Sequence, residues 1–167
     1  MSSRNRVRKL RSLESLESRN LLTIVVDTLV DEFDGSITDG DISLRDAIAA
    51  ADAGDRITLD VEGEIQLDFF GLGPLSIDKA LEIVGPGAGQ LEISGPFTAL
   101  GEPQITIDDG NGAVESPVTI SGVDIDVSGQ GLISNETLVL RDVAIPRTTT
   151  RIAGTSQIND AWKPDFE

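Results

Sequence analysis

Cysteine and histidine are both absent from this sequence of 167 residues. Without cysteine, the chain forms no disulfides and offers no thiolate ligand to a metal. Without histidine, it lacks the commonest general base and the relay residue of serine hydrolases. Aromatic residues are also few, with five Phe, one Trp and no Tyr, so we expect no platform of rings for stacking sugars or bases. These absences exclude the commonest kinds of catalytic centre.

Acidic residues dominate the charge, and basic residues gather near the start of the chain. The net charge is −16. Residues 1–22 carry six basic and two acidic side chains (+4), whereas the other 145 residues carry seven basic and 27 acidic side chains (−20). These 145 acidic-rich residues repel nucleic acid and anionic membranes. In addition, no apolar run approaches the roughly 20 residues of a membrane-spanning helix. We therefore expect no nucleic-acid partner and no transmembrane segment.

The basic segment, residues 1–22, is set apart from the acidic body. The apolar stretch that follows its charges, 21–26, is six residues long, whereas a secretory signal needs roughly 7–15 apolar residues. The sequence therefore contains no convincing secretory signal. Residues 1–22 are interpreted as a disordered basic tail or as a targeting segment, and their removal stays an open question.

Carboxylates are concentrated in the stretch "DTLVDEFDGSITDGD" (27–41). Oxygen ligands at this density suit Ca²⁺. An EF-hand, however, needs ligands at alternate positions, glycine at the sixth and glutamate at the twelfth, and no register of this stretch satisfies that pattern. A structural loop with Asp-Gly turns is the interpretation, and a calcium site is the alternative. Its candidate ligands are Asp31, Asp34, Asp39 and Asp41.

One segment has clear helical periodicity and predicts a helix over about 43–53. Ser43 suits the N-cap, and Asp46, three residues later, has the spacing of a capping box. Gly54 is placed to end the helix. Apolar residues recur at i, i+3, i+4 and i+7, which gives one apolar stripe that must cover other apolar groups. The stripe consists of Leu44, Ala47, Ile48 and Ala51, whereas Arg45, Asp46, Ala49 and Asp52 lie off it.

From Arg56 onward the apolar period changes to two, in short runs separated by Gly, Pro, Asn or Asp. The run "VTISGVDI" (118–125) aligns with "LVLRDVAI" (138–145) at an offset of 20 residues, and apolar residues meet at every inward position. Such an offset is the length of one solenoid coil. We predict an all-β, right-handed parallel β-helix of about three coils over residues 23–145. A β-sandwich is the alternative.

The predicted helix has a role in this fold. The first coil of a solenoid exposes an apolar end and an unpaired strand edge. An amphipathic helix just before the first strand, "DRITL" (55–59), covers both. We therefore interpret the helix as an N-terminal cap.

Two stretches carry a family resemblance. "ISLRDAIAAADAGDRITL" (42–59) followed by "GPLSIDKALEIVGPGAGQLEISG" (73–95) resembles the N-terminal region of CSLREA-domain proteins, which are β-helical, adhesin-like bacterial surface proteins. Asp46 replaces the family Glu, and Ile42 stands at the position of the cysteine. "LESLESRNLLT" (13–23) is similar to the LEPR-XLL segment of large exported or surface-located bacterial proteins, with Ser15 and Ser18 where proline is expected.

The resemblance implies an extracellular or cell-surface location and contacts with extracellular carbohydrate or cell-surface components. It ends at about residue 145, and the stretch 146–167 has no strand–turn pattern. We expect an irregular or disordered tail there, and interpret the chain as a truncated, frame-shifted or diverged member. A lower end without a cap predicts end-to-end self-association.

Parallel β-helices also include polysaccharide lyases and hydrolases, which use carboxylates on one sheet face, often with Ca²⁺. Asp124 and Asp126 alternate with apolar residues and so face outward on one strand, and Asp108 and Asp109 are expected in a neighbouring coil. Paired outward carboxylates also occur on any solvated strand. The leading hypothesis is a non-catalytic structural or adhesion-like segment without a cofactor. The alternative is a carbohydrate-active enzyme with Asp124 and Asp126 as its catalytic candidates.

Overall fold

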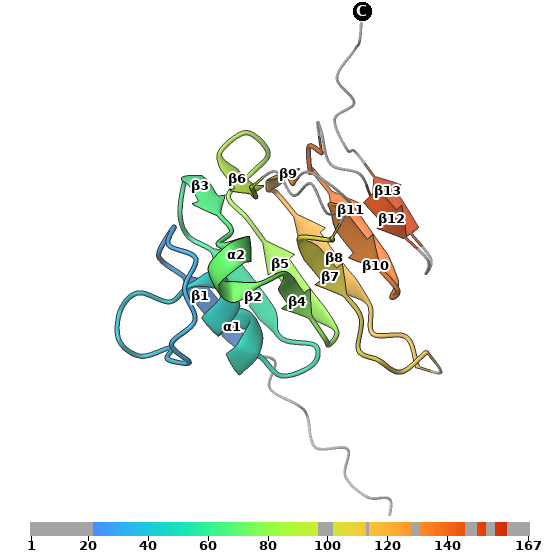
Figure 1. The fold of residues 1–167 in the computed structure, drawn as a ribbon, viewed down its shortest axis with the longest axis horizontal. Helices are drawn as coiled ribbons and strands as arrows, with labels where there is room; N and C mark the ends of the chain where they lie inside the picture. Colours follow the sequence, from blue (N-terminus) through green and yellow to red (C-terminus); the bar gives the residue numbers. More distant parts are fainter. Residues whose placement is uncertain are drawn as a thin grey trace, which may run out of the picture.

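The computed structural model describes residues 22–96, 102–112, 114–127, 131–145, 150–152 and 156–159. In this part of the chain, parallel strands stack into a right-handed β-solenoid of about four turns (Figure 1). The expectations for the basic segment (1–22) and for the LEPR-XLL resemblance (13–23) fall almost entirely on residues 1–21, which lie outside the described residues.

Three parallel sheets form the walls of the solenoid, and from β2 onward successive strands of the chain pass from one sheet to another. The six-stranded sheet contains β1 (Thr23–Val26), β2 (Arg56–Leu59), β5 (Leu81–Val84), β8 (Val118–Ser121), β11 (Leu138–Arg141) and β13 (Ser156–Asn159). The three-stranded sheet contains β3 (Gly63–Gln66), β6 (Leu91–Ser94) and β9 (Asp124–Asp126). The four-stranded sheet contains β4 (Leu75–Ile77), β7 (Ile105–Ile107), β10 (Leu132–Ser134) and β12 (Thr150–Ile152).

The strand register confirms the predicted stacking. Leu138 pairs with Val118 and Arg141 with Ser121, at the offset of 20 residues seen in the sequence. Every recorded strand pair is parallel, whereas the sheets of a sandwich of the immunoglobulin type are antiparallel. The β-helix prediction is therefore confirmed and the β-sandwich alternative is excluded.

Aliphatic side chains of the coils from β1 to β11 fill the interior. Along β8, for example, Val118 and Ile120 are buried while Thr119 and Ser121 are partly exposed. This period of two sends alternate side chains inward and outward. Small aliphatic residues suit the narrow interior, which agrees with the scarcity of aromatic residues.

The predicted helix is α1 (Leu44–Ala50), with Ser43 as its N-cap: the Ser43 side chain accepts a hydrogen bond from the Asp46 main-chain nitrogen. The predicted end of the helix, at residue 53 before Gly54, was wrong, because Ala51 already has an extended backbone and is the C-cap. All four residues of the apolar stripe are buried. The helix lies against the first two strands of the six-stranded sheet (Figure 1). It therefore covers apolar groups of the first coil, as predicted, but it does not cover the edge of β2, which pairs with β1.

The prediction that "DRITL" is the first strand was wrong. Strand β1 precedes α1 in the chain and pairs in parallel with β2, so the terminal edge of the six-stranded sheet is β1. The stretch 21–26 lacks the alternation of apolar and polar residues that reveals a strand, so the sequence pattern did not predict β1. A short helix, α2 (Phe69–Leu72), also lies between β3 and β4.

The structure also differs from the expected irregular tail. Strands β12 and β13 lie within residues 146–167 and pair with β10 and β11. Parallel pairing is made by main-chain groups, so it does not require the strand–turn pattern whose absence ended the prediction at residue 145.

Candidate functional site

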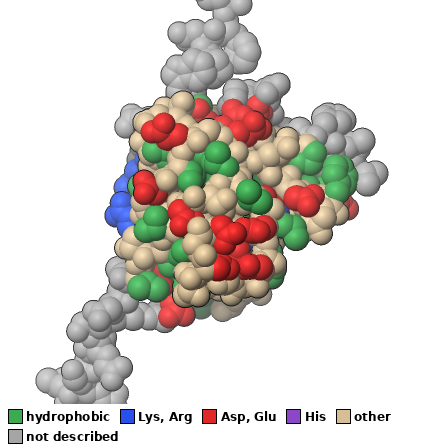
Figure 2. Space-filling view, turned by 90° about the vertical axis from the view of Figure 1, so that its left-hand side faces the viewer, with side chains coloured by type: hydrophobic (Ala, Val, Ile, Leu, Met, Phe, Trp, Pro, Cys, Tyr) green, Lys and Arg blue, Asp and Glu red, His purple; other side chains and the backbone are tan. Residues whose placement is uncertain are grey.

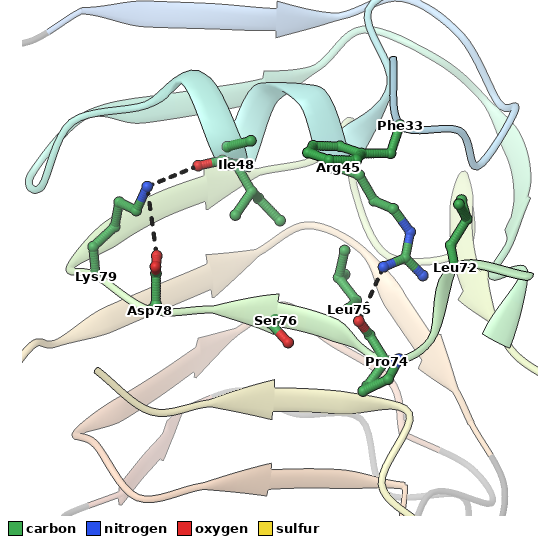
Figure 3. Close-up of a pocket in the computed structure, with 10 residues that line it drawn as sticks. Phe33, Arg45, Ile48, Leu72, Pro74, Leu75, Ser76, Asp78 and Lys79 are labelled. Atoms are coloured by element: carbon green, nitrogen blue, oxygen red, sulfur yellow. Dashed lines mark hydrogen bonds and ion pairs between the residues drawn. The ribbon is translucent and has the colours of Figure 1, made fainter. Parts of the chain in front are cut away.

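A groove of about 410 Å³ lies between α1 and the edge strand β4. Figure 3 shows the helix along one side of the groove and β4 along the other. The groove is lined by Phe33, Arg45, Ile48, Ala49, Leu72, Pro74, Leu75, Ser76, Asp78 and Lys79. Helix α1 thus takes the place that a further strand of the four-stranded sheet would have, and the groove is the space left between the two.

Arg45 closes one end of the groove, and each of its three guanidinium nitrogens donates a hydrogen bond. Its Nε donates to Asp31 Oδ1 at 2.7 Å, and its two terminal nitrogens donate to the carbonyls of Pro74 and Gly73 at 3.0 and 2.9 Å. The side chains of Arg45 and Asp31 are 9% and 1% exposed. The guanidinium therefore joins α1 to the segment before β4, and its charge is neutralised inside the protein.

Lys79 closes the other end of the groove. Its ammonium donates to the carbonyls of Ile48 and Ala51, both at 3.2 Å, and lies 3.4 Å from Asp78 Oδ1. A cation at the last carbonyls of a helix satisfies acceptors that have no partner within the helix. Lys79 thus fastens the end of α1 to the first complete coil.

The floor of the groove is the free edge of β4. Leu75 donates its main-chain N–H to Gln104 O at 2.8 Å, and Ile77 O accepts from Asp108 N at 3.0 Å, so both residues direct their main-chain groups toward β7. Main-chain groups of successive residues in a parallel strand point to opposite edges. Ser76 therefore directs its N–H and C=O toward α1, where they are available to a bound ligand.

Apolar side chains surround this polar floor. Phe33 is 58% and Leu72 39% exposed although both line the groove. The segment 27–42, which contributes Phe33, lies at the β1 end of the solenoid (Figure 1). At that end acidic and apolar side chains are interspersed (Figure 2). The groove can therefore hold a ligand with an apolar face and a few hydrogen-bonding groups.

The four predicted calcium ligands all lie in segment 27–42. Asp31 binds Arg45, and Asp34 Oδ1 accepts from Ser36 N at 2.8 Å. Repulsion by Asp39 raises the pKa of Asp41, while a hydrogen bond from Ser36 lowers the pKa of Asp39. In the described part of the chain, no three of these carboxylates come within 4.8 Å of one another. The calcium site in this segment stays a prediction.

The predicted catalytic residues Asp124 and Asp126 lie on β9 and are partly exposed. Asp124 binds main chain on both sides: Oδ2 accepts from Gly89 N at 3.0 Å, and Oδ1 accepts from Ala144 N at 3.2 Å. Asp108 and Asp109 follow β7 in a different sheet. The structure therefore does not gather the four carboxylates into one cluster, and it gives Asp124 a role in holding neighbouring coils together.

Asp108 and Asp109 instead meet Glu136, which the sequence analysis did not single out. One carboxylate oxygen of each lies within 4.8 Å of the others. Glu136 is buried and accepts from Ser116 N at 2.8 Å, and the Ser116 hydroxyl donates to Asp109 Oδ2 at 2.7 Å. The hydrogen bond from this hydroxyl is the main reason why the pKa of Asp109 is lowered. A glutamate 27 positions after Asp109 could have been found only with the coil length known.

The fold places the chain in the class of parallel β-solenoids. Comparisons with protein-family models, curated proteins and solved structures return no match. Among the described residues, no helix has the length and apolar character needed to cross a membrane.

Proposed function

We propose that this chain is a non-catalytic, structural or adhesion-like β-solenoid segment of an exported or cell-surface bacterial protein. The observation that carries the proposal is that carboxylates on β9 and in two loops hold neighbouring segments together by hydrogen bonds. Asp124 is bonded to main-chain nitrogens of two other coils, and Glu136 and Asp109 fasten the loop before β8. Carboxylates engaged in this way stabilise the stack of coils.

The resemblance to CSLREA-domain proteins supports the cell-surface location. A rigid solenoid presents its loops and outward side chains as a continuous surface, which suits contacts with extracellular carbohydrate or cell-surface components. Detection of the protein on intact cells by antibody tests the location, and detection only after cell lysis contradicts it.

The groove between α1 and β4 is the contact surface that we propose for such a ligand. Phe33→Ala removes the exposed ring beside the groove, because Phe33 lines it. Phe70→Ala is a matched control, since Phe70 is 77% exposed but lies outside the groove. We expect pull-down on an insoluble, uncharged polysaccharide such as cellulose to be lost in the Phe33 variant and kept in the Phe70 variant, because a chain of net charge −16 repels anionic polymers. Equal binding by both variants contradicts this role of the groove.

A separate measurement addresses catalysis. Incubation with pectin or alginate is expected to leave chain length unchanged, as followed by release of reducing or unsaturated ends. Cleavage that disappears in the Asp124→Ala/Asp126→Ala variant, while circular dichroism shows an intact fold, would overturn the non-catalytic proposal in favour of a carbohydrate-active enzyme.

A further inference from the structure

We infer that Asn111 is a site of spontaneous deamidation through a cyclic imide formed with Gly112. The two residues are exposed in the segment between β7 and β8. Of the five asparagines in the sequence, Asn111 alone precedes glycine. A residue without a Cβ lets its main-chain nitrogen approach the neighbouring amide carbon with the least steric hindrance.

The nitrogen of Gly112 is accessible. Within the described residues it takes part in no hydrogen bond, and a Cβ built on Gly112 would meet nothing within 4 Å. The other Asx-Gly pair of this loop is different, because Gly110 N donates to Asp108 Oδ1 at 2.8 Å. Gly35, which follows Asp34, likewise donates to Asp46 Oδ1 at 2.8 Å. The fold thus leaves a reactive nitrogen beside the one asparagine that can use it.

The reaction needs only water as co-reactant. The nitrogen of Gly112 attacks Cγ of Asn111, the new C–N bond forms, and the bond from Cγ to the amide nitrogen breaks. The proton from Gly112 nitrogen leaves with that amide nitrogen as ammonia. Water then opens the five-membered imide at one carbonyl or the other, which gives aspartate or isoaspartate at position 111.

Either product changes the loop. A carboxylate at position 111 adds a negative charge to the loop that holds Asp108 and Asp109, because Asn111 N lies 2.6 Å from Asp109 Oδ1. In isoaspartate the main chain also runs through the former side chain. The carbonyl of Asn111 that accepts from Val114 N at 3.1 Å then belongs to a free carboxylate outside the main chain, so this main-chain hydrogen bond is lost.

Asn135 is an internal control in the same molecule. Its side-chain nitrogen donates to Asp108 Oδ2 at 2.7 Å, its main-chain nitrogen donates to Ile107 O at 2.9 Å, and the next residue, Glu136, is buried. Asn135 is exposed as well, so a difference between the two asparagines reports local structure and the following residue, rather than access to water.

The test is peptide mapping by mass spectrometry after incubation of the full chain at neutral and at mildly acidic pH. We expect a mass gain of about one unit at Asn111, faster at neutral pH and with an isoaspartate fraction, while Asn135 stays intact. Gly112→Ala should slow the conversion at position 111 by an order of magnitude. A synthetic peptide of residues 108–116 gives the rate of deamidation of the same sequence in the absence of the fold. If Asn111 in the folded chain converts no faster than Asn135, the inference is overturned.

Discussion

At the scale of single residues, the ion pair of Arg45 and Asp31 joins α1, segment 27–42 and the chain before β4. Asp31 uses its second oxygen to accept from Asp68 N at 2.7 Å, so both of its oxygens are engaged. A charge buried in this way is stable only while its partner is present.

Asp31→Ala is expected to cost about 3–5 kcal/mol in the free energy of unfolding, because it leaves the Arg45 guanidinium buried without its counter-charge. Urea unfolding measures the change. Glu82→Ala breaks a pair that is 47% and 46% exposed, and its expected cost is below about 1 kcal/mol. Equal costs for the two variants contradict the structural role assigned to Arg45.

The stability should also depend on pH through Asp109. Its pKa is lowered from 3.8 in the folded chain, chiefly by the Ser116 hydroxyl. A lowered folded pKa means that the unfolded chain binds the proton more tightly, so the contribution is complete above pH 3.8 and is lost as the pH falls through the folded value. Ser116→Ala should therefore flatten the loss of stability below pH 3.8, as followed by thermal unfolding across that range. An unchanged pH profile would show that the hydroxyl does not act on Asp109.

At the scale of elements, α1 is a folding device that depends on its apolar stripe. Leu44 and Ile48 are 1% and 4% exposed. Leu44→Ala should lower the free energy of unfolding by about 2–5 kcal/mol. The double variant Leu44→Asp/Ile48→Asp should expose the end of the solenoid and cause aggregation. Ala49→Ser, on the exposed side of the helix, is the control. Urea unfolding measures the stability of each variant, and size-exclusion chromatography detects aggregation. Unchanged stability of the double Asp variant would contradict the role of α1 as a cap.

The apolar period predicted α1, its N-cap and the strands of the later coils, since each pattern is local to its element. It could not predict that Arg45 and Asp46, which lie off the stripe, are buried. Their burial involves segment 27–42, which has no period of its own: Asp31 pairs with Arg45, and Gly35 N donates to Asp46. The candidate groove was missed for the same reason, because its walls come from α1, α2, β4 and this segment.

At the scale of the whole molecule, stacked coils of unequal length build one continuous core. Register partners lie 20 residues apart between β8 and β11 but 37 apart between β5 and β8 (Leu81 and Val118). Because the coils differ in length, only β8 and β11 show a clear repeat in the sequence. Asn111 and the acidic group of Asp108 and Asp109 lie in the segment between β7 and β8.

The central claim is this stacking of coils, and a disulfide between neighbouring coils tests it most directly. Ser76 on β4 and Thr106 on β7 are register partners, with their hydroxyl oxygens 3.1 Å apart. Adjacent strands are about 4.8 Å apart, within the range that a disulfide spans. The natural chain has no cysteine, so a double variant carries no competing thiol.

We predict that the Ser76→Cys/Thr106→Cys variant forms an intramolecular disulfide almost completely under mild oxidation, measured by thiol titration and the shift in gel mobility. The Ser76→Cys/Thr119→Cys variant, whose second cysteine lies in a different sheet on β8, should stay reduced. Failure of the first pair to close, or equal closure of both pairs, would contradict the solenoid.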